Sequence, residues 1–180
     1  SHIKDKIIEM THLNESIYAA GIAASYQGHK MKSGVFLNDD MLANVCKHNV
    51  TRLPYELARL AQDIAGGLLV TLPSEAEFRS PETGPILKKY LKGRTGAEVE
   101  NRMRILRLIE NMTMGRNAVG YLTESMHGAG SPQAQRIQIA RQMQLGYKKQ
   151  LAKDLAKVKE EPDEISENSE YFKRVFNTDN

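Results

Sequence analysis

The sequence predicts an all-α protein, folded as an up-and-down bundle of four long helices with shorter helices between them. Apolar residues recur at intervals of three and four through much of the 180 residues, which is the spacing of one helix face. Capping residues, several with a proline beside them, precede the periodic segments. The chain has no long run of alternating apolar and polar residues, the pattern typical of half-buried strands.

The first helix is expected over residues 3–26, where Ile7, Leu13 and Ile17 follow the helical spacing. Its second half is rich in alanine and other small residues, so another helix or a ligand can approach it closely. A basic loop, residues 28–34, is expected to follow.

Two further helices are predicted in the first half of the chain. One begins at the polar and acidic run 38–40 and ends near residue 49, because carboxylates are favoured at a helix N-terminus. The next begins at Pro54, since proline suits the first helical turn, and it ends at the glycine pair 66–67. The apolar segment 68–73 is predicted to be extended and buried.

Two capping boxes predict where later helices begin. Ser74 pairs with Glu77, and Thr95 pairs with Glu98, at the spacing that lets each side chain bond the other residue's backbone N–H. Between them, a short helix is expected from residue 82 to about residue 91.

The second capping box is predicted to open a long helix that runs toward Tyr121. Ser131 and Pro132 then begin the last long helix, which is predicted to run to about Val158. Residues 1–158 are therefore assigned to one helical bundle, and residues 159–180 to an acidic tail. Aromatic residues in the tail make it a candidate to dock on a neighbouring subunit.

Composition excludes several classes of protein. The net charge is only +3, and the basic residues are spread along the helices, so no nucleic-acid partner is expected. A single cysteine, Cys46, excludes an intramolecular disulfide. No apolar run approaches the roughly 20 residues that span a bilayer, so no membrane partner is expected and a cytoplasmic protein is predicted.

A carboxylate stands directly before a glycine-rich loop. Glu124 is followed by Gly128 and Gly130, a helix starts at residues 131–132, and Arg136 lies one turn inside it. Glycine lets a bound group approach the backbone, and the N–H groups of a helix start bind anions. A general base beside such a loop suits a flavin enzyme that abstracts a proton next to a thioester.

Four blocks carry a family resemblance: LANVCK (42–47), LAQDIAGG (60–67), ENRMRILR (100–107) and the stretch around Glu124. In this order they resemble the C-terminal domain of the 4-hydroxybutyryl-CoA dehydratase/vinylacetyl-CoA isomerase branch. That branch belongs to the flavoprotein superfamily of acyl-CoA dehydrogenases and 4-hydroxyphenylacetate 3-hydroxylase. The resemblance extends to about Lys159 and implies the helical bundle of the acyl-CoA dehydrogenase C-terminal domain.

The resemblance also implies roles for individual residues. Glu124 is the active-site base at the acyl carbons of the substrate, near the flavin ring. Partial burial would move the pKa of such a base toward the working pH. Gln62, Gly66 and Gly67 correspond to an element that meets FAD, often across a subunit interface. A helix end terminated by glycine explains the same residues locally.

The residues flanking Glu124 are further cofactor-binding candidates: Thr123, Ser125, His127 and Gly128. A hydroxyl or imidazole there can bond the flavin or a thioester carbonyl. The same side chains can equally cap the helix ends, and the sequence leaves both interpretations open.

No metal site is assigned to this chain. The resembling dehydratases hold a [4Fe-4S] cluster through three cysteines and one histidine, whereas Cys46 is the only cysteine here and matches no ligand position. The resemblance begins partway through that family's proteins. We therefore expect the chain to be the C-terminal piece of a longer polypeptide, with the cluster ligands and the N-terminal flavoenzyme domains lying before residue 1.

The function that the resemblance implies is dehydration of 4-hydroxybutyryl-CoA to crotonyl-CoA and isomerisation of vinylacetyl-CoA, a lyase and isomerase that uses FAD. This domain would supply the base, part of the flavin-binding wall and much of a homotetramer interface, and alone it is expected to be inactive. Two alternatives stay open. One is a domain of a flavin-dependent 4-hydroxyphenylacetate 3-hydroxylase-type monooxygenase, and the other is a non-catalytic helical assembly module.

Overall fold

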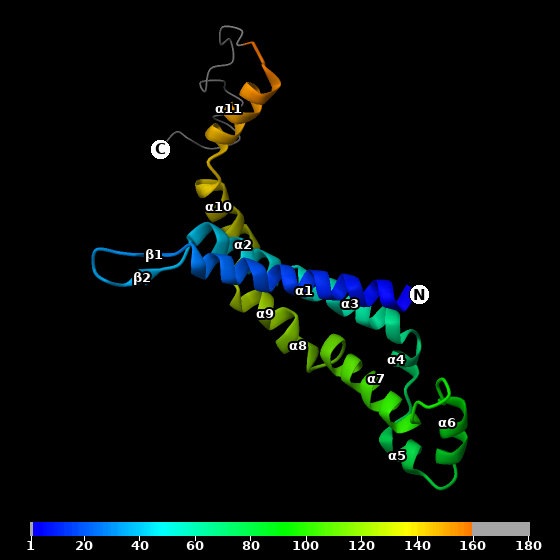
Figure 1. Ribbon diagram of the computed structural model, residues 1–180. Helices are drawn as coiled ribbons and strands as arrows, with labels where there is room; N and C mark the ends of the chain where they lie inside the picture. The colour runs from blue at the N-terminus through cyan, green and yellow to red at the C-terminus, as the bar shows by residue number, and fades with distance from the viewer. Residues whose placement is uncertain (1, 160–180) are drawn as a thin grey trace. The chain divides into compact units, whose positions relative to one another are not determined.

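The computed structural model describes residues 2–159, and helices make up most of that part (Figure 1). The all-α prediction is confirmed, since the described residues contain only two strands, each of two residues. The chain divides into two compact units, Ser1–Met143 and Gln144–Asn180. The candidate site lies in the first unit.

Helix α1 (His2–Tyr26) is followed by a small antiparallel hairpin, where a basic loop was predicted. In the hairpin, β1 (His29–Lys30) pairs with β2 (Phe36–Leu37), so that His29 lies opposite Leu37. A Cβ on Gly28 would lie 2.5 Å from the Phe36 ring and 2.6 Å from the Leu37 carbonyl oxygen. Only glycine therefore lets the chain leave α1 into this hairpin.

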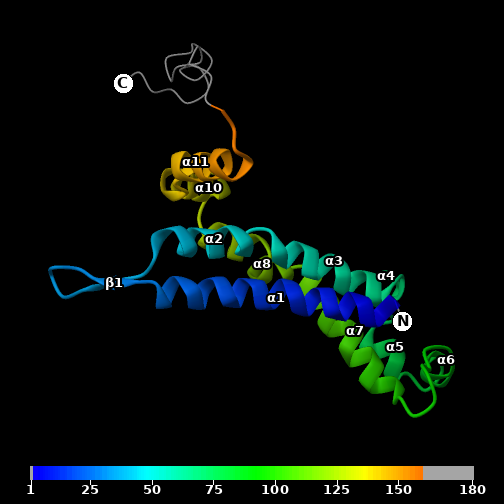
Figure 2. The ribbon, with the colours of Figure 1, turned by 45° about the horizontal axis from the view of Figure 1, so that its top comes forward.

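The next two helices begin where the sequence predicts. Helix α2 (Asp40–Val50) is capped by the Asp39 carboxylate, which accepts a 2.7 Å hydrogen bond from the Leu42 N–H. Helix α3 (Leu53–Ala65) has Pro54 in its first turn and ends at Gly66. Both helices pack against α1, and Figures 1 and 2 show α3 running alongside it.

The segment predicted to be extended is instead the one-turn helix α4 (Leu68–Thr71). Leu68 and Leu72 both pack on the core cluster formed by Phe78, Leu91 and Met103. A strand would place Val70 on the same face as Leu68 and Leu72, yet Val70 is 73% exposed and its neighbour Leu69 is buried, which is the spacing of a helical turn. Packing therefore overrides the local apolar pattern.

Helix α5 (Glu75–Arg79) begins with the predicted capping box, which is confirmed. The Ser74 hydroxyl accepts from the Glu77 N–H, while the Glu77 carboxylate accepts from the Ser74 N–H at 2.7 Å. Helix α6 (Gly84–Tyr90) follows. The second predicted capping box is wrong, because Glu98 is itself the N-cap of α7 (Val99–Thr113) and makes no side-chain capping bond.

The long helices of the second half are interrupted. Helix α7 ends at Thr113, because Met114 is extended and Gly115 has a φ of +64°; α8 (Ala118–Tyr121) begins after this turn. Helix α10 (Pro132–Gln142) ends before Gln144, whose φ of +49° is left-handed. Helix α11 (Leu145–Ala156) belongs to the second unit.

Two arrangements position the candidate site. Helix α3 packs against both α1 and α7, and α10 packs against α2. The Gln142 amide also donates to the Asp40 carboxylate, which ties the end of α10 to the start of α2. The boundary at residue 158 and the docking tail remain predictions, because residues 160–180 lie outside the described part of the chain.

Candidate functional site

The predicted base lies on a very short helix. Glu124 is in the first turn of α9 (Thr123–Gly128), which follows α8 after the single residue Leu122. Its side chain is exposed, and no hydrogen bond or ion pair holds its carboxylate among the described residues. A Cβ on Gly120 would lie 3.6 Å from Glu124 Oε2, so the carboxylate rests over the small residue of the preceding helix. Glu124 is thus available to an incoming group.

The flanking candidates have different surroundings. The Ser125 hydroxyl donates a 3.0 Å hydrogen bond to the Gly120 carbonyl, so it holds α9 against α8. Thr123 and His127 are exposed, and Gly128 has no atom within 4 Å of the position that a Cβ would take. Three of the four candidates therefore face open space, whereas Ser125 has a structural partner.

The loop after α9 is shaped by Gln135, a residue of the Glu124 block to which the sequence assigned no role of its own. Gly130 has a φ of +92°, a conformation that favours glycine, and it turns the chain into α10. Gln135 is only 2% exposed, and its Nε2 donates to the carbonyl oxygens of Ala129 at 2.7 Å and Gly130 at 3.1 Å. No spacing in the sequence separates this buried glutamine from its exposed neighbour Gln133.

The predicted flavin element lies at the C-terminal end of α3. Gln62 is half-buried and donates through Nε2 to the Thr113 carbonyl at 3.0 Å. Gly66 has φ +67° and ψ −160°, whereas Gly67 has helical angles. Both glycines are exposed, and neither has an atom within 4 Å of a would-be Cβ. Their backbone is open to approach by a flat group.

An apolar groove is lined by sequence neighbours of two of the candidate residues. A cavity of about 720 Å³ lies between α1, α3, α7 and α8. It is lined by Ala61, next to Gln62, and by Leu122, next to Thr123. None of the eight predicted site residues lines it among those described. The groove therefore does not bring the side chains of the two predicted elements together.

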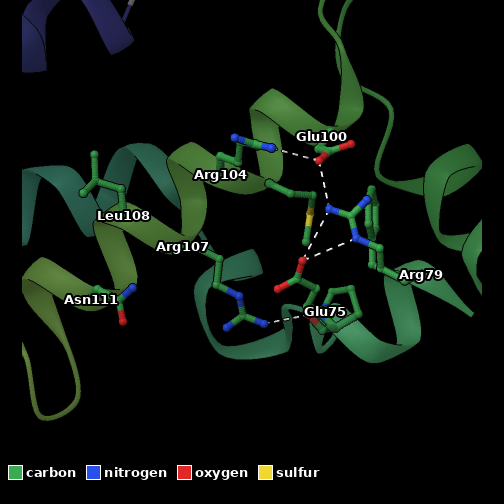
Figure 3. Close-up of a pocket in the computed structure, with 10 residues that line it drawn as sticks. Glu75, Arg79, Glu100, Arg104, Arg107, Leu108 and Asn111 are labelled. Carbon is green, nitrogen blue, oxygen red and sulfur yellow. Dashed lines mark hydrogen bonds and ion pairs between the residues drawn. The ribbon is translucent and has the colours of Figure 1, made fainter.

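A second cavity, of about 550 Å³, lies between α5 and α7 and is rich in arginine (Figure 3). Arg79 bonds both Glu75 and Glu100, and Arg104 also bonds Glu100 (Figure 3). The hydrogen bond from Arg79 holds the pKa of the Glu100 carboxyl below its ordinary value. Arg107 donates to the Pro73 carbonyl at 2.6 Å. The charged side chains that line this cavity are paired with one another. They form a network of ion pairs between α5 and α7.

The described residues contain neither a cluster of metal ligands nor a helix able to span a membrane. Within residues 2–159, no three histidine, cysteine or acidic side chains lie close enough together to hold a metal ion. The Cys46 thiol points to the Ile17 carbonyl, with Sγ 3.5 Å from the oxygen. Among the helices described, none combines the length and apolar character needed to cross a bilayer.

Comparison with known proteins places the chain in a family. The family described as "4-hydroxyphenylacetate 3-hydroxylase C terminal" matches residues 1–157. The 4-hydroxybutyryl-CoA dehydratase/vinylacetyl-CoA-Delta-isomerase of Clostridium aminobutyricum is 56% identical over 88% of this chain and 34% of its own length. The 4-hydroxyphenylacetate 3-monooxygenase oxygenase component of Thermus thermophilus is 28% identical over 63% of this chain and 23% of its own.

A solved structure agrees with the sequence comparisons. The oxygen-tolerant archaeal 4-hydroxybutyryl-CoA dehydratase from N. maritimus superposes with a TM-score of 0.81 and 79% sequence identity. The match covers 99% of this chain and 36% of that chain. The chain thus spans about a third of the length of each of these two dehydratases.

Proposed function

The chain belongs to the 4-hydroxyphenylacetate 3-hydroxylase C-terminal family, and from that membership we propose that it is the C-terminal part of an FAD-dependent 4-hydroxybutyryl-CoA dehydratase. The longer protein that contains it, called the complete protein below, dehydrates 4-hydroxybutyryl-CoA to crotonyl-CoA and isomerises vinylacetyl-CoA. We also propose that it acts in the cytoplasm as a homotetramer. The observation that carries the proposal is the continuous likeness to two such dehydratases over 88% and 99% of the chain.

Glu124 is the proposed base. Its carboxylate is exposed and has no partner among the described residues, so it is free to take a proton from an acyl carbon of the bound thioester. A base works best when its pKa lies near the working pH, and burial of the carboxylate raises its pKa. In the complete protein, that burial would come from the substrate, the cofactor and the domains that close over α9.

The residues around two glycines fit a flat cofactor. The backbone at Gly67 and at Gly128 is exposed and has no atom within 4 Å of a would-be Cβ, which leaves room for a ring system to lie against it. Gln62, Gly66, Thr123 and His127 border the same two places. FAD, when bound, would supply one-electron chemistry. The proposed role of these residues is to bind FAD and to orient it beside Glu124.

An iron–sulfur cluster does not fit the residues described here. Such clusters are held by several thiolates, and the thiol of Cys46, the single cysteine, points to the Ile17 carbonyl. We therefore derive no step through a cluster from this chain. If the complete protein holds one, its ligands come from outside the 180 residues.

Exposed apolar side chains support assembly with further protein. Along the groove between α1, α3 and α7, Ile7 is 52% exposed, Leu108 52% and Tyr121 55%. Removal of apolar surface from water favours association by roughly 25 cal/mol per Å², a gain from which the entropic cost of binding is subtracted. The N-terminal domains and neighbouring subunits of the complete protein are the proposed partners that cover such surfaces.

The proposal is tested by replacing Glu124 with glutamine in the complete protein. We expect turnover of 4-hydroxybutyryl-CoA to fall by roughly 10²–10⁴-fold, the usual contribution of a positioned general base. Flavin absorbance should show that FAD stays bound. Glu9→Gln, which changes an exposed carboxylate on α1, serves as the control and should leave turnover unchanged. Full activity of Glu124→Gln would refute the assignment of the base.

The family name favours a second candidate, a flavin-dependent phenol hydroxylase of the 4-hydroxyphenylacetate type. Supplying the complete protein with a phenol and reduced FAD separates the two. Hydroxylated product without dehydration of the thioester would support this alternative. A third candidate is a non-catalytic assembly module. It predicts that the 180-residue chain forms an oligomer and that a titration detects no binding of FAD to it.

A further inference from the structure

Helix α9, which carries Glu124, is short and contacts mainly α8. It is six residues long, Thr123–Gly128, and none of them is buried. An isolated helix of this length is far below the 12–15 residues that make even a good helix former marginally stable in water. Contacts with α8 and with the loop that follows must therefore fix its position.

One contact anchors the start of α9 and another holds its end. At the start, the Ser125 hydroxyl donates to the Gly120 carbonyl at 3.0 Å. At the end, the Gln135 amide donates to Ala129 O at 2.7 Å and to Gly130 O at 3.1 Å. Ala129 is the C-cap of α9 and Gly130 follows it, so these two bonds fix the chain directly after the helix and supply donors that the backbone does not.

The geometry of Gln135 defines which way its amide faces. Both protons of Nε2 are directed to carbonyl oxygens, and Oε1 is buried without a hydrogen-bond partner among the described residues. Turning the amide over would place oxygen against oxygen at two positions. An unpaired buried acceptor is unfavourable, so the two bonds made by the nitrogen must offset this cost in the observed orientation.

Gln135 also connects α9 to a helix that is packed against the rest of the unit. It lies on α10, which packs against α2 and is tied to it again by the bond from Gln142 to the Asp40 carboxylate. We propose that Gln135 is the positioning residue that holds α9, and with it Glu124, in the orientation required for catalysis. The catalytic part of this inference rests on the proposed function, in which Glu124 is the base.

The test compares Gln135→Met with Gln133→Met in the complete protein. Methionine keeps most of the volume of glutamine but donates no hydrogen bond. Gln133 is exposed on the same helix, so its change is the matched control. Amide hydrogen exchange should accelerate by roughly tenfold or more over residues 124–130 in Gln135→Met only, because two bonds of about 1 kcal/mol each are lost. The kcat should fall more than the KM changes.

A second variant separates positioning from simple loss of stability. In Gln135→Glu, an ionised carboxylate repels both carbonyls, whereas a protonated carboxyl donates one hydrogen bond. Its kcat relative to wild type should therefore rise as the pH is lowered, while the ratio for Gln135→Met should show no such recovery. A purely structural role would lower the melting temperature of both variants without this pH-dependent rescue.

The outcomes distinguish the two proposals. Unchanged exchange in Gln135→Met would overturn the anchoring of α9, whatever Glu124 does. Faster exchange with an unchanged kcat would overturn the positioning role. Full activity of Glu124→Gln, in protein whose amide exchange over α9 matches wild type, would instead refute the proposed base. The anchoring of α9 by Gln135 would then still stand.

Discussion

The Nε2 of Gln62 donates a 3.0 Å hydrogen bond to the carbonyl oxygen of Thr113, 51 residues later in the chain. Thr113 is the last residue of α7, and Gln62 lies in the last turn of α3. The bond supplies a partner to a helix-end carbonyl and joins the two helices where both lead toward the candidate site. A residue that resembles a flavin contact thus also has a structural role.

Gln62→Met should therefore destabilise the protein even without flavin. Loss of the bond leaves the Thr113 carbonyl without its donor, and we expect a decrease of about 1–2 kcal/mol in the free energy of unfolding. Urea unfolding of the 180-residue chain measures it. Gln27→Met, at an exposed position after α1, is the control. Equal midpoints for the two variants would mean that the bond contributes nothing.

The glycine pair after α3 allows a test of flavin binding free of backbone strain. Gly66 has φ +67° and ψ −160°, a region open essentially to glycine alone, so Gly66→Val should cost of order 1–3 kcal/mol in stability. Gly67 has φ −60° and ψ −16°, which valine also adopts. In the complete protein, Gly67→Val should lower FAD affinity at least roughly tenfold with little change in melting temperature. Unaltered affinity would remove Gly67 from the cofactor site.

The core cluster of the first unit predicts contrasting effects on one helix. Met103 is 8% exposed and packs with Phe78 and Leu91, whereas Ile105 on the same helix is 58% exposed. Met103→Ala should cost about 2–5 kcal/mol and Ile105→Ala less than about 1 kcal/mol. Chemical denaturation of both variants checks the ratio. In the complete protein, a large effect at Ile105 would show that a partner covers it.

Glu100 should give a characteristic acid response. The hydrogen bond from Arg79, followed by that from Arg104, holds its pKa below the ordinary value of 4.5. A carboxyl whose folded-state pKa is lowered stabilises the fold above the unfolded-state pKa, and that stabilisation is lost as the pH falls through the folded-state value. NMR titration should show the pKa of Glu100 rising toward 4.5 in Arg79→Met. A titration midpoint identical to wild type would mean that the ion pair does not form in solution.

Local signals predicted much of the fold correctly. The cap at Asp39, the capping box of Ser74 with Glu77 and the start at Pro54 all involve residues within three or four positions of one another. The order of the motif blocks likewise led to the family. The failures have two causes. Packing of Leu68 and Leu72 on the core accompanies a helical turn where an extended segment was predicted, and positive φ angles at Gly115 and Gln144 interrupt the long helices predicted to pass them.

The sequence by itself determined the helical class, the main helix starts and the family, because hydrophobic period, capping and motif order are properties of neighbouring residues. The tertiary structure decided that Gln135 is buried and bonded to the loop after α9, and that Gln62 reaches Thr113. A glutamine in a helix looks the same in sequence whether it faces water or a neighbouring carbonyl. Only the packing of α10 on α2 and of α3 on α7 distinguishes the two, since burial depends on segments distant in the chain.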